Sequence, residues 1–469
     1  MSEYYVVLNN PLIFMNDAYL KNILQGKYSS VTYSIISLNE IPEKIIFIFK
    51  DSKLSDSFIA DYNEKFFDEK MDYKLNLEKT AQKPEEINSL LQKESSKSNP
   101  YTYQKSYQNE WRINYSNTPD KDGLLFLNEE EKQLGYKAVK FLVKKFGQNL
   151  LNGKSILNIS LPVFMFDKRT LHEAFVWELV HCPYFLTKAV YSKDPLEKLK
   201  WVTTFYISKF HLSIIQLKPF NPIIGETFQC RIGNVDIYLE HTVNHPITAN
   251  FYAKEMNGNY KMYGYQITDA STNVNSITAS RLGKFFIELK DGSKYRIYIP
   301  DVVLKGISVG DRIINFVGIG CVVDLTHNLC AFMEMNPDQP GFFSSFFMKK
   351  KTFPDHFKGR ICDLKYVTLD EKGDNHQLSK DANCLSEIEG EWTSSLSFDG
   401  IEYWNIDDYK AFKIYTHDFT LPSNGTHRED LKKLIEGNED ESQTEKERLE
   451  VRQREDRKLR ANYMNNKKQ

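Results

Sequence analysis

Two prolines fix a short segment in which a lysine and an asparagine could bind a phosphate group. Pro219 and Pro222 disfavour a helix, so Lys218 and Asn221 are expected on an extended or turning loop that can aim their side chains. A lysine ammonium suits phosphate oxygens, and a histidine such as His245 can donate a ring N–H to the same atoms. Chemistry alone leaves two readings open: a phosphate site, or a solvated lysine with an ordinary turn histidine, which is the more common arrangement.

A second charged group recurs at four-residue spacing near the end of the chain. Lys446, Glu450 and Arg454 share one face of a predicted helix, and Lys458 continues the stripe. Residues 446–469 hold nine basic and four acidic side chains, a net of +5, whereas the whole chain has a formal net charge of −2. The pattern fits either an anion-binding stripe or a solvated terminal helix with favourable ion pairs.

An amphipathic helix is predicted over residues 134–151. Lysines at 137, 140 and 144 lie largely opposite its apolar face. Composition alone favours an ordinary surface helix packed on a domain. The apolar face consists of Val139, Leu142, Val143, Phe146 and Leu150.

The long central stretch predicts extensive antiparallel sheet. It contains alternating or aromatic runs such as FFIEL, KYRIYI and AFMEM, with turn residues such as Asp291-Gly292 between two of them. The chain has 31 Phe and 27 Tyr, and aromatic residues favour pleated, half-buried surfaces. The fold class is therefore predicted to be β-rich α+β.

Composition divides the chain into three parts. Residues 1–75 alternate short apolar runs with polar breaks and predict a small α/β module. Residues 76–124 are rich in Lys, Ser, Gln and Asn, which is typical of a solvated linker. Residues 125–469 then form the large domain.

Bulk properties exclude several classes of protein. A net charge of −2 does not suit a protein that wraps nucleic acid. The six cysteines are scattered, without the spacing of a metal site or a disulfide framework, so no metal or cofactor is expected and a reducing cytoplasm fits best. We find neither a signal peptide nor an apolar run of the roughly 20 residues that span a bilayer.

Four separated segments, in order, resemble the oxysterol-binding-protein-related family. Lys218–Phe228 is close to a complete match, and Glu240–Ile247 stands where the family reads EQVSHHPP. The order and spacing of the segments identify the chain as a member of that family. The segments are Ile159–Phe164 with Asp194–Lys198, Lys218–Phe228, Glu240–Ile247, and Leu421–Ser423 with Arg428–Asp430 and Glu445–Glu450.

The resemblance implies a near-closed antiparallel β-barrel around a central lipid tunnel, with helices after it. The predicted helix occupies the place of the family's lid, at about 134–158, and with Leu161 and Pro162 it would form the tunnel entrance. The family's headgroup site, which holds phosphatidylinositol 4-phosphate, maps onto Lys218, Asn221, Asn244, His245, Lys446, Glu450 and Arg454.

The implied function is non-enzymatic lipid transfer between membranes, by a cytoplasmic protein that contacts membrane surfaces transiently at membrane contact sites. Phosphatidylinositol 4-phosphate would be exchanged for phosphatidylserine or a sterol. The family often carries a pleckstrin-homology-like unit, which is one option for the first module. Lys65–Asp68 faintly resembles the tract by which members dock on an endoplasmic-reticulum receptor, although its two phenylalanines also fit a core.

One position departs from the family pattern. Asn244 replaces the first of two adjacent histidines, and an amide cannot become cationic, so headgroup binding should weaken by about 1 kcal/mol. This departure keeps an alternative open, namely a lipid sensor or membrane-contact tether without net transport. A hydrolase using His245 and Glu240 is disfavoured because the sequence contains no GxSxG elbow.

Overall fold

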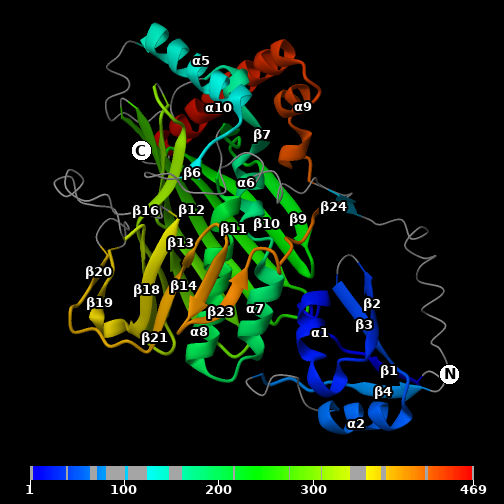
Figure 1. Ribbon diagram of the computed structural model, residues 1–469. Coiled ribbons are helices and arrows are strands. Elements are labelled where there is room, and N and C mark those ends of the chain that lie inside the picture. The colour runs from blue at the N-terminus through cyan, green and yellow to red at the C-terminus, as the bar shows by residue number, and fades with distance from the viewer. Residues whose placement is uncertain are drawn as a thin grey trace.

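A large, strongly curved antiparallel sheet dominates the computed structural model of this protein (Figure 1). Sixteen strands belong to the sheet. The structure describes residues 4–38, 41–63, 71–80, 101–103, 124–146, 161–214, 217–273, 275–307, 309–337, 355–370, 376–417 and 421–466.

The strands of the large sheet follow one another mostly as hairpins. Their path of neighbours is β23-β22-β21-β18-β17-β16-β14-β13-β12-β11-β10-β9-β24-β5, with β15 paired to β13 and β16, and β6 paired to β16. The first half comprises β5 (Tyr101–Tyr103), β6 (Leu124–Leu125), β9 (Thr227–Ile232), β10 (Val235–Asn244), β11 (Ile247–Glu255), β12 (Tyr260–Asn273), β13 (Ser276–Leu289) and β14 (Lys294–Tyr298). The second half comprises β15 (Asp301–Lys305), β16 (Ile313–Asp324), β17 (Leu329–Met335), β18 (His356–Asp363), β21 (Ser386–Glu391), β22 (Ser395–Phe398), β23 (Ile401–Asn405) and β24 (Ile414–His417).

Alternation along these strands gives the sheet one buried face. In β10 the side chains of Val235, Ile237 and Leu239 are buried while those of Tyr238 and Glu240 are exposed, as the two-residue period of a strand requires. The predicted turn at Asp291-Gly292 joins β13 to β14, and Gly292 has a φ of 88°, which favours glycine.

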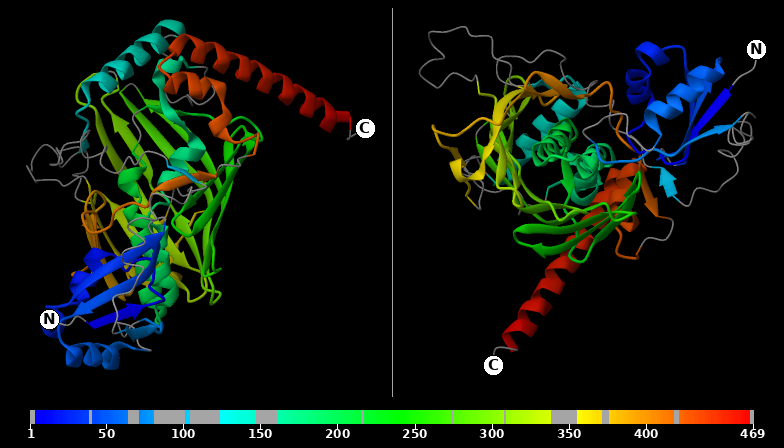
Figure 2. Two further views of the ribbon diagram at one scale, coloured as in Figure 1. Left: turned by 90° about the vertical axis from the view of Figure 1, so that its right-hand side faces the viewer. Right: turned by 90° about the horizontal axis from the view of Figure 1, so that it is seen from below.

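Three helices fill the concave side of this sheet. The sheet curls around α6 (Leu171–Trp177), α7 (Cys182–Tyr191) and α8 (Pro195–Ser208), as the view from below in Figure 2 shows. Thr170 and Asp194 cap α6 and α8 by accepting hydrogen bonds from backbone N–H groups, at 3.2 and 3.0 Å. Nine of the ten residues of α7 are buried, because this helix lies inside the domain. The near-closed antiparallel barrel predicted from the sequence is therefore confirmed.

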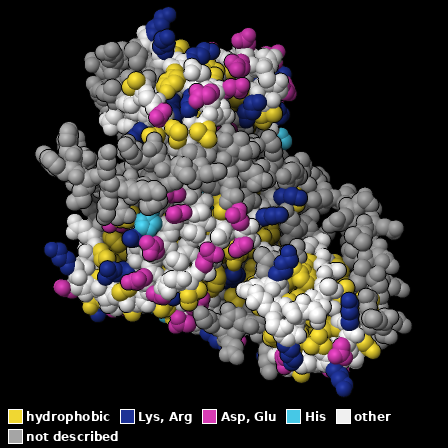
Figure 3. Space-filling view, viewed as in Figure 1, with side chains coloured by type: hydrophobic (Ala, Val, Ile, Leu, Met, Phe, Trp, Pro, Cys, Tyr) yellow, Lys and Arg dark blue, Asp and Glu magenta, His cyan; other side chains and the backbone are white. Residues whose placement is uncertain are grey.

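Helices and short strands complete one end of the barrel. Figure 1 shows α5 (Glu129–Phe146), α9 (Glu429–Ile435) and α10 (Glu439–Asn466) grouped there, and one view in Figure 2 shows α10 projecting away from the body. Basic and acidic side chains are interspersed on the face drawn in Figure 3, as the near-neutral net charge suggests. Short elements elsewhere in the domain, some of them away from this end, are β7 (Phe166–Thr170) paired with β8 (Lys218–Phe220), β19 (Val367–Thr368) paired with β20 (Gln377–Leu378), and the 3-10 turns η3 (Val163–Met165), η4 (Phe210–Leu212), η5 (Leu364–Tyr366) and η6 (Gly425–His427).

The N-terminal module is a four-stranded antiparallel sheet with the order β2-β3-β1-β4. Its contacts with the large domain include the N–H of Asp72, which donates to the carbonyl of Tyr191 at 2.7 Å, and the Lys188 ammonium, 5.3 Å from the ring centroid of Phe14. The module's elements are β1 (Tyr4–Leu8), α1 (Asp17–Ile23), η1 (Gly26–Tyr28), β2 (Thr32–Leu38), β3 (Ile41–Phe49), α2 (Ser52–Tyr62) and β4 (Leu77–Thr80).

The structure changes details of the predicted boundaries. The strand β4 belongs to the module although it follows residue 75, and β5, inside the predicted linker, pairs with β24 of the large sheet. Both strands are held by pairing with distant strands, which local composition does not reveal. The tract Lys65–Asp68 lies outside the described residues. No helix in the described parts of the chain has the length and apolarity needed to cross a bilayer.

Candidate lipid-binding site

A cavity of about 270 Å³ lies within the curved sheet. Its walls are mostly apolar, and alternate residues of two neighbouring strands point into it because side chains alternate between the faces of a strand. On β12 these residues include Thr268, Ala270 and Thr272, and on β13 they are Ile277, Ala279 and Arg281.

The helix α5 covers one end of this cavity. Leu134, Gly135 and Ala138 line the cavity from α5. The helix is held there by the hydroxyl of Tyr136, which donates to the carbonyl of Gly310 at 2.9 Å, and by the Lys137 ammonium, 4.4 Å from the ring centroid of Phe164. The predicted lid helix thus lies over the opening, although it runs from Glu129 to Phe146 and begins earlier than expected.

The remaining predicted entrance residues fall into two groups. Leu161 is buried and lines the cavity, and Pro162 precedes the turn η3 directly beside it. Val139, Leu142, Val143 and Phe146 lie in α5, but their side chains are outside the described part of the structure, as are residues 147–158.

Changing the lid tests its role in retaining a ligand. We expect Leu134→Asp to speed the loss of a bound lipid by roughly fivefold, because a carboxylate replaces an apolar side chain that faces the cavity. Transfer of a fluorescent lipid from loaded protein to acceptor liposomes measures this rate. Gln133→Asp is the matched control, since the neighbouring side chain is exposed. Equal rates for the two variants would contradict a lid function.

Two lysines meet at the mouth of the cavity. Parallel pairing of β7 with β8 sets Phe166 opposite Lys218, whose ammonium lies 4.9 Å from the centroid of the Phe166 ring. The ammonium of Lys446, from α10, lies 5.4 Å from the same centroid. Lys218 donates to Asn221 Oδ1 at 2.5 Å, and Lys446 donates to Glu450 Oε1 at 2.6 Å. The structure therefore brings together four of the predicted headgroup residues.

The electrostatics of this mouth favour an anion. Burial, together with the positive charges of Lys446 and Arg428, lowers the pKa of Lys218 to about 7, while Glu450 opposes the shift. Lys446 is 4% exposed. Two close ammonium groups in a partly dehydrated place repel each other, and an anion between them would relieve that repulsion.

The predicted residues on β10 are arranged differently. The Oδ1 atom of Asn244 accepts a hydrogen bond from Gln453 Nε2 at 3.0 Å and lies 3.2 Å from Nε2 of His241. Asn244 thus connects the end of β10 to α10. His245 and Arg454 are exposed, and their roles in headgroup binding stay predictions.

Sequence reasoning did not assign Arg428 to the site. Its guanidinium donates to the carbonyl of Asn221 at 2.7 Å, to Glu226 at 3.0 Å and to Asp430 at 2.7 Å. Arg428 therefore fixes the loop that carries Lys218 and Asn221. Arg428 lies in one of the segments that match the family, and this position could have marked it as a candidate. Its burial could not be read from the sequence.

The fold and the site together define a class of protein: a barrel whose largely apolar internal cavity is covered by a helix and has two lysines at its mouth, which suits a lipid. The family model described as Oxysterol-binding protein matches residues 148–469. This chain belongs to the oxysterol-binding protein family, as the sequence predicted, and that is a family of lipid-binding proteins.

Individual relatives agree with this assignment. Oxysterol-binding protein 9 of Dictyostelium discoideum is 33% identical over 327 residues, which cover 68% of this chain and 74% of the relative. Oxysterol-binding protein-related protein 8 of Mus musculus is 24% identical over 307 residues, covering 62% of this chain but only 31% of that protein.

Solved structures show the same fold at low identity. The Osh1 ORD domain in complex with cholesterol matches with a TM-score of 0.55 and 17% identity, covering 77% of this chain and 89% of that one. The Osh3 ORD in complex with PI(4)P, from Saccharomyces cerevisiae, matches with a TM-score of 0.52 and 20% identity, covering 68% and 84%.

Proposed function

We propose that this protein carries single lipids between membranes, exchanging phosphatidylinositol 4-phosphate for a second lipid, either phosphatidylserine or a sterol. The observation that carries the proposal is the mouth of the cavity, where the ammonium groups of Lys218 and Lys446 both lie near the ring of Phe166, beside an apolar interior. A phosphorylated headgroup fits the lysines, and hydrocarbon fits the walls. The activity requires no reaction at the lipid, so the proposed role is non-enzymatic.

The lid explains how such a carrier could move a lipid through water. Extraction exposes hydrocarbon at a cost of about 25 cal/mol per Å², so the ligand must be covered on every side. In this structure α5 covers the cavity, with Leu134 and Ala138 facing inward. Opening of α5 at a membrane surface would expose both the cavity and the lysines, and we therefore propose a peripheral location at membranes.

Two named neighbours support this choice of ligands. The Osh3 ORD is described in complex with PI(4)P and the Osh1 ORD in complex with cholesterol. The matched segment Lys218–Phe228 and the stripe of Lys446 and Glu450 supply the headgroup residues of the proposal. The choice between phosphatidylserine and a sterol depends on the interior of the cavity.

Liposome extraction tests the exchange directly. Purified protein is mixed with liposomes that contain separately labelled phosphatidylinositol 4-phosphate, phosphatidylserine and sterol, and the lipid that leaves with the protein is measured. We expect the phosphoinositide and one competing lipid to be extracted, each displacing the other. Extraction of one neutral lipid alone would contradict exchange and support a lipid sensor. Asn244→His then shows whether a second histidine improves phosphoinositide binding.

Headgroup binding should depend on pH through Lys218. Its pKa is about 7, so above that pH the amine is largely neutral. A bound phosphate favours the charged form, so binding should take up a proton, and affinity should fall as the pH rises above about 7. The phosphate itself is already doubly ionised there, because its second pKa is about 6.

Calorimetry in two buffers of different ionisation enthalpy measures that proton. Short-chain phosphatidylinositol 4-phosphate is titrated into the protein at pH 8, and net proton uptake is expected for the wild type. Lys218→Arg is the control, because a guanidinium stays protonated at this pH. Uptake that persists in Lys218→Arg would assign the proton to another group.

A further inference from the structure

Four of the six cysteines come together at one side of the large sheet. Cys321 lies on β16, Cys330 on β17 and Cys362 on β18, and Cys384 precedes β21 by two residues. These four strands are neighbours in the order β16-β17-β18-β21. The four residues, here named the cysteine row, are scattered in the sequence, and only the folded sheet brings them together.

The register of the strands places the thiols of the cysteine row next to one another. Cys330 and Cys362 are directly paired across β17 and β18. On its other side Cys330 is paired with Val323, two residues from Cys321, and the thiols of Cys321 and Cys330 are in hydrogen-bond contact. These three cysteines face outward, because the residues beside them in the chain belong to the core inside the barrel, namely Val322, Ala331 and Ile361.

A flap formed by residues 364–383 covers part of this outer face. The structure describes residues 364–370 and 376–383 of the flap, and Figure 1 shows its short strands β19 and β20 at the edge of the barrel. Cys321 and Cys330 are buried in an outer apolar cluster beneath it. The apolar side chains that the flap packs against this cluster are Leu364, Val367, Leu369 and Leu378.

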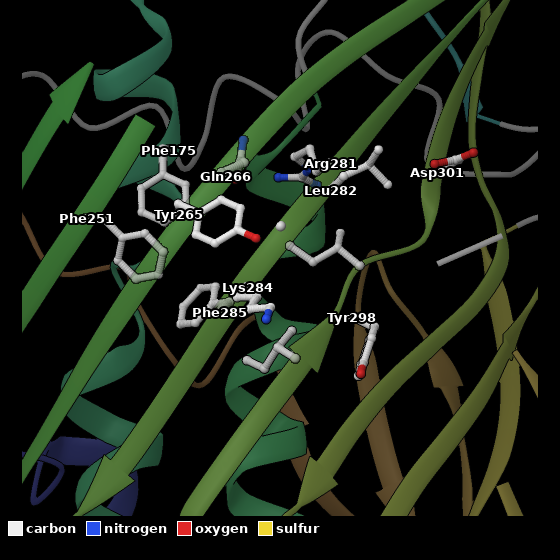
Figure 4. Close-up of a pocket in the computed structure, with 13 residues that line it drawn as sticks. Phe175, Phe251, Tyr265, Gln266, Arg281, Leu282, Lys284, Phe285, Tyr298 and Asp301 are labelled. Atoms are coloured by element: carbon white, nitrogen blue, oxygen red, sulfur yellow. The ribbon is translucent and has the colours of Figure 1, made fainter. Parts of the chain in front are cut away.

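Tyr298 and His376 add a contact between the flap and the outer cluster. Tyr298, at the end of β14, packs on the cluster, and its ring centroid lies 4.7 Å from that of His376 in the flap. Figure 4 shows Tyr298 apart from the rings of Phe175 and Phe285, which belong to the core inside the barrel. The flap therefore rests on a separate apolar cluster outside the sheet.

Two hydrogen bonds at the base of the flap set Cys384 opposite Cys362. The two cysteines lie between these bonds, as in a non-hydrogen-bonded pair of antiparallel strands, whose Cα atoms are about 4.5 Å apart. Disulfides join residues whose Cα atoms are about 4.4–6.8 Å apart, so this arrangement permits a disulfide. The bonds run from the N–H of Leu385 to the carbonyl of Ile361, at 2.8 Å, and from the N–H of Asp363 to Oδ1 of Asn383, at 3.0 Å.

The two thiols differ in their access to solvent. Cys384 is the exposed one of the six cysteines, whereas Cys362 is fully buried. Burial, together with the neighbouring thiols of Cys330 and Cys384, raises the pKa of Cys362 to about 12, while Arg360 opposes the shift. An oxidant in solution therefore reaches Cys384 first, and Cys362 stays protected until its neighbour has reacted.

We propose that Cys384 and Cys362 form an oxidation site for hydrogen peroxide, at which a reversible disulfide ties the flap to β18. The thiolate of Cys384 attacks the peroxide, an S–O bond forms and the O–O bond breaks, so the sulfur is oxidised to a sulfenic acid and the peroxide is reduced to water. The sulfur of Cys362 then gives up its proton and attacks the sulfur of Cys384. The S–S bond forms, the S–O bond breaks, and a second water leaves.

The disulfide belongs to an oxidised state that a thiol reductant reverses. In a reducing compartment such disulfides are transient and typical of redox-sensing sites. The site lies on the outer face of the sheet and makes no use of the cavity or its mouth. Oxidation at this pair and lipid carriage can therefore be tested separately, and failure of one leaves the other standing.

Peroxide treatment of the full-length wild-type protein tests the pair. Free thiols are then blocked with N-ethylmaleimide, and the protein is digested without reductant for mass spectrometry. We expect a peptide that links Cys362 to Cys384 and that dithiothreitol separates. Before oxidation, N-ethylmaleimide should modify Cys384 at least roughly tenfold faster than any of the five buried cysteines. A link through Cys330 or Cys321 instead, or a Cys384 that stays reduced, would overturn the proposal.

Variants assign the two steps. Cys362→Ala removes the second thiol, so the sulfenic acid of Cys384 should persist and react with dimedone. Cys384→Ser, at an exposed position, should leave Cys362 reduced. Cys330→Ala is the matched control, because it removes a buried thiol of the same row and keeps the proposed pair. Loss of the link in this control, or no dimedone adduct in Cys362→Ala, would show that the reaction follows another route.

Limited proteolysis measures whether the disulfide holds the flap. Trypsin cuts after exposed lysines of the flap such as Lys365 and Lys380. We expect the peroxide-treated wild type to be cut there roughly fivefold more slowly than the reduced protein, because a link at the base restricts local opening. Peroxide-treated Cys384→Ser should be cut as fast as the reduced wild type. Equal rates for oxidised and reduced wild type would show that the flap is not tied.

Discussion

Purified Lys218→Ala protein is expected to extract phosphatidylinositol 4-phosphate from liposomes at least about tenfold less well than the wild type. The ammonium of Lys218 lies at the mouth beside Asn221 and Phe166, where a phosphate would receive a charge-assisted hydrogen bond. Lys446 alone would then remain near the ring of Phe166. The expected loss of phosphoinositide extraction is large because Lys218 would contact the phosphate in a partly dehydrated site and not at the open surface.

This variant should remain folded, which makes its binding defect easy to interpret. Burial and the neighbouring charges of Lys446 and Arg428 lower the pKa of Lys218, so removal of the lysine relieves its repulsion from those two charges. Lys432→Ala is the control, since Lys432 is a half-exposed lysine paired with Glu429 on α9. Extraction of the second lipid should be unchanged in both variants. Full phosphoinositide extraction by Lys218→Ala would refute the proposed headgroup site.

The largest loss of stability is expected for Arg428→Met. Arg428 compensates two buried carboxylates, those of Glu226 and Asp430, and it also donates to the carbonyl of Asn221. Burial raises the pKa of Glu226, and Arg428 opposes that shift, so the substitution leaves the carboxylate without its main compensation. We expect the free energy of unfolding to fall by roughly 3–5 kcal/mol.

Urea unfolding followed by tryptophan fluorescence measures this difference. Arg231→Met provides the comparison, because Arg231 and Asp236 form an ion pair at 2.7 Å whose side chains are 19% and 24% exposed. That variant should lose less than about 1 kcal/mol. A similar small loss for Arg428→Met would show that the carboxylates are satisfied without the arginine. Glu226 should take up a proton as the pH falls, so the deficit of Arg428→Met should shrink in acid.

Much of the barrel could be predicted because its determinants are local. The alternation in the strands now seen as β13, β14 and β17 is written in consecutive residues, as is the turn at Asp291-Gly292. The extended segment around Lys218 follows from Pro219 and Pro222, which restrict the backbone at their own positions. The family followed from the order of several such segments, and the comparison with relatives confirms it.

The boundaries of the N-terminal module and of the helix α5 were harder to predict from the sequence. The strand β4 forms because β1 offers it a partner, and β5 because β24 does, although the sequence around both reads as a polar linker. The lid helix begins at Glu129, before the apolar stripe that revealed it. Local composition says little about which distant strands will pair. It also says little about where a helix begins when its first turn has no apolar pattern.

The sequence by itself determined the antiparallel strands, the amphipathic helix now seen as α5, and the extended backbone around Lys218, because each depends on neighbours along the chain, while the closure of the barrel was implied by the family resemblance. Only the tertiary structure decided that Lys218 and Lys446 share one ring, that Arg428 anchors their loop, and that Asn244 holds Gln453 of α10. It alone brought Glu178, Lys209 and Arg281 together as buried ion pairs. The physical reason is that burial and charge pairing depend on which distant segments close around a side chain, and those segments meet only in the folded barrel.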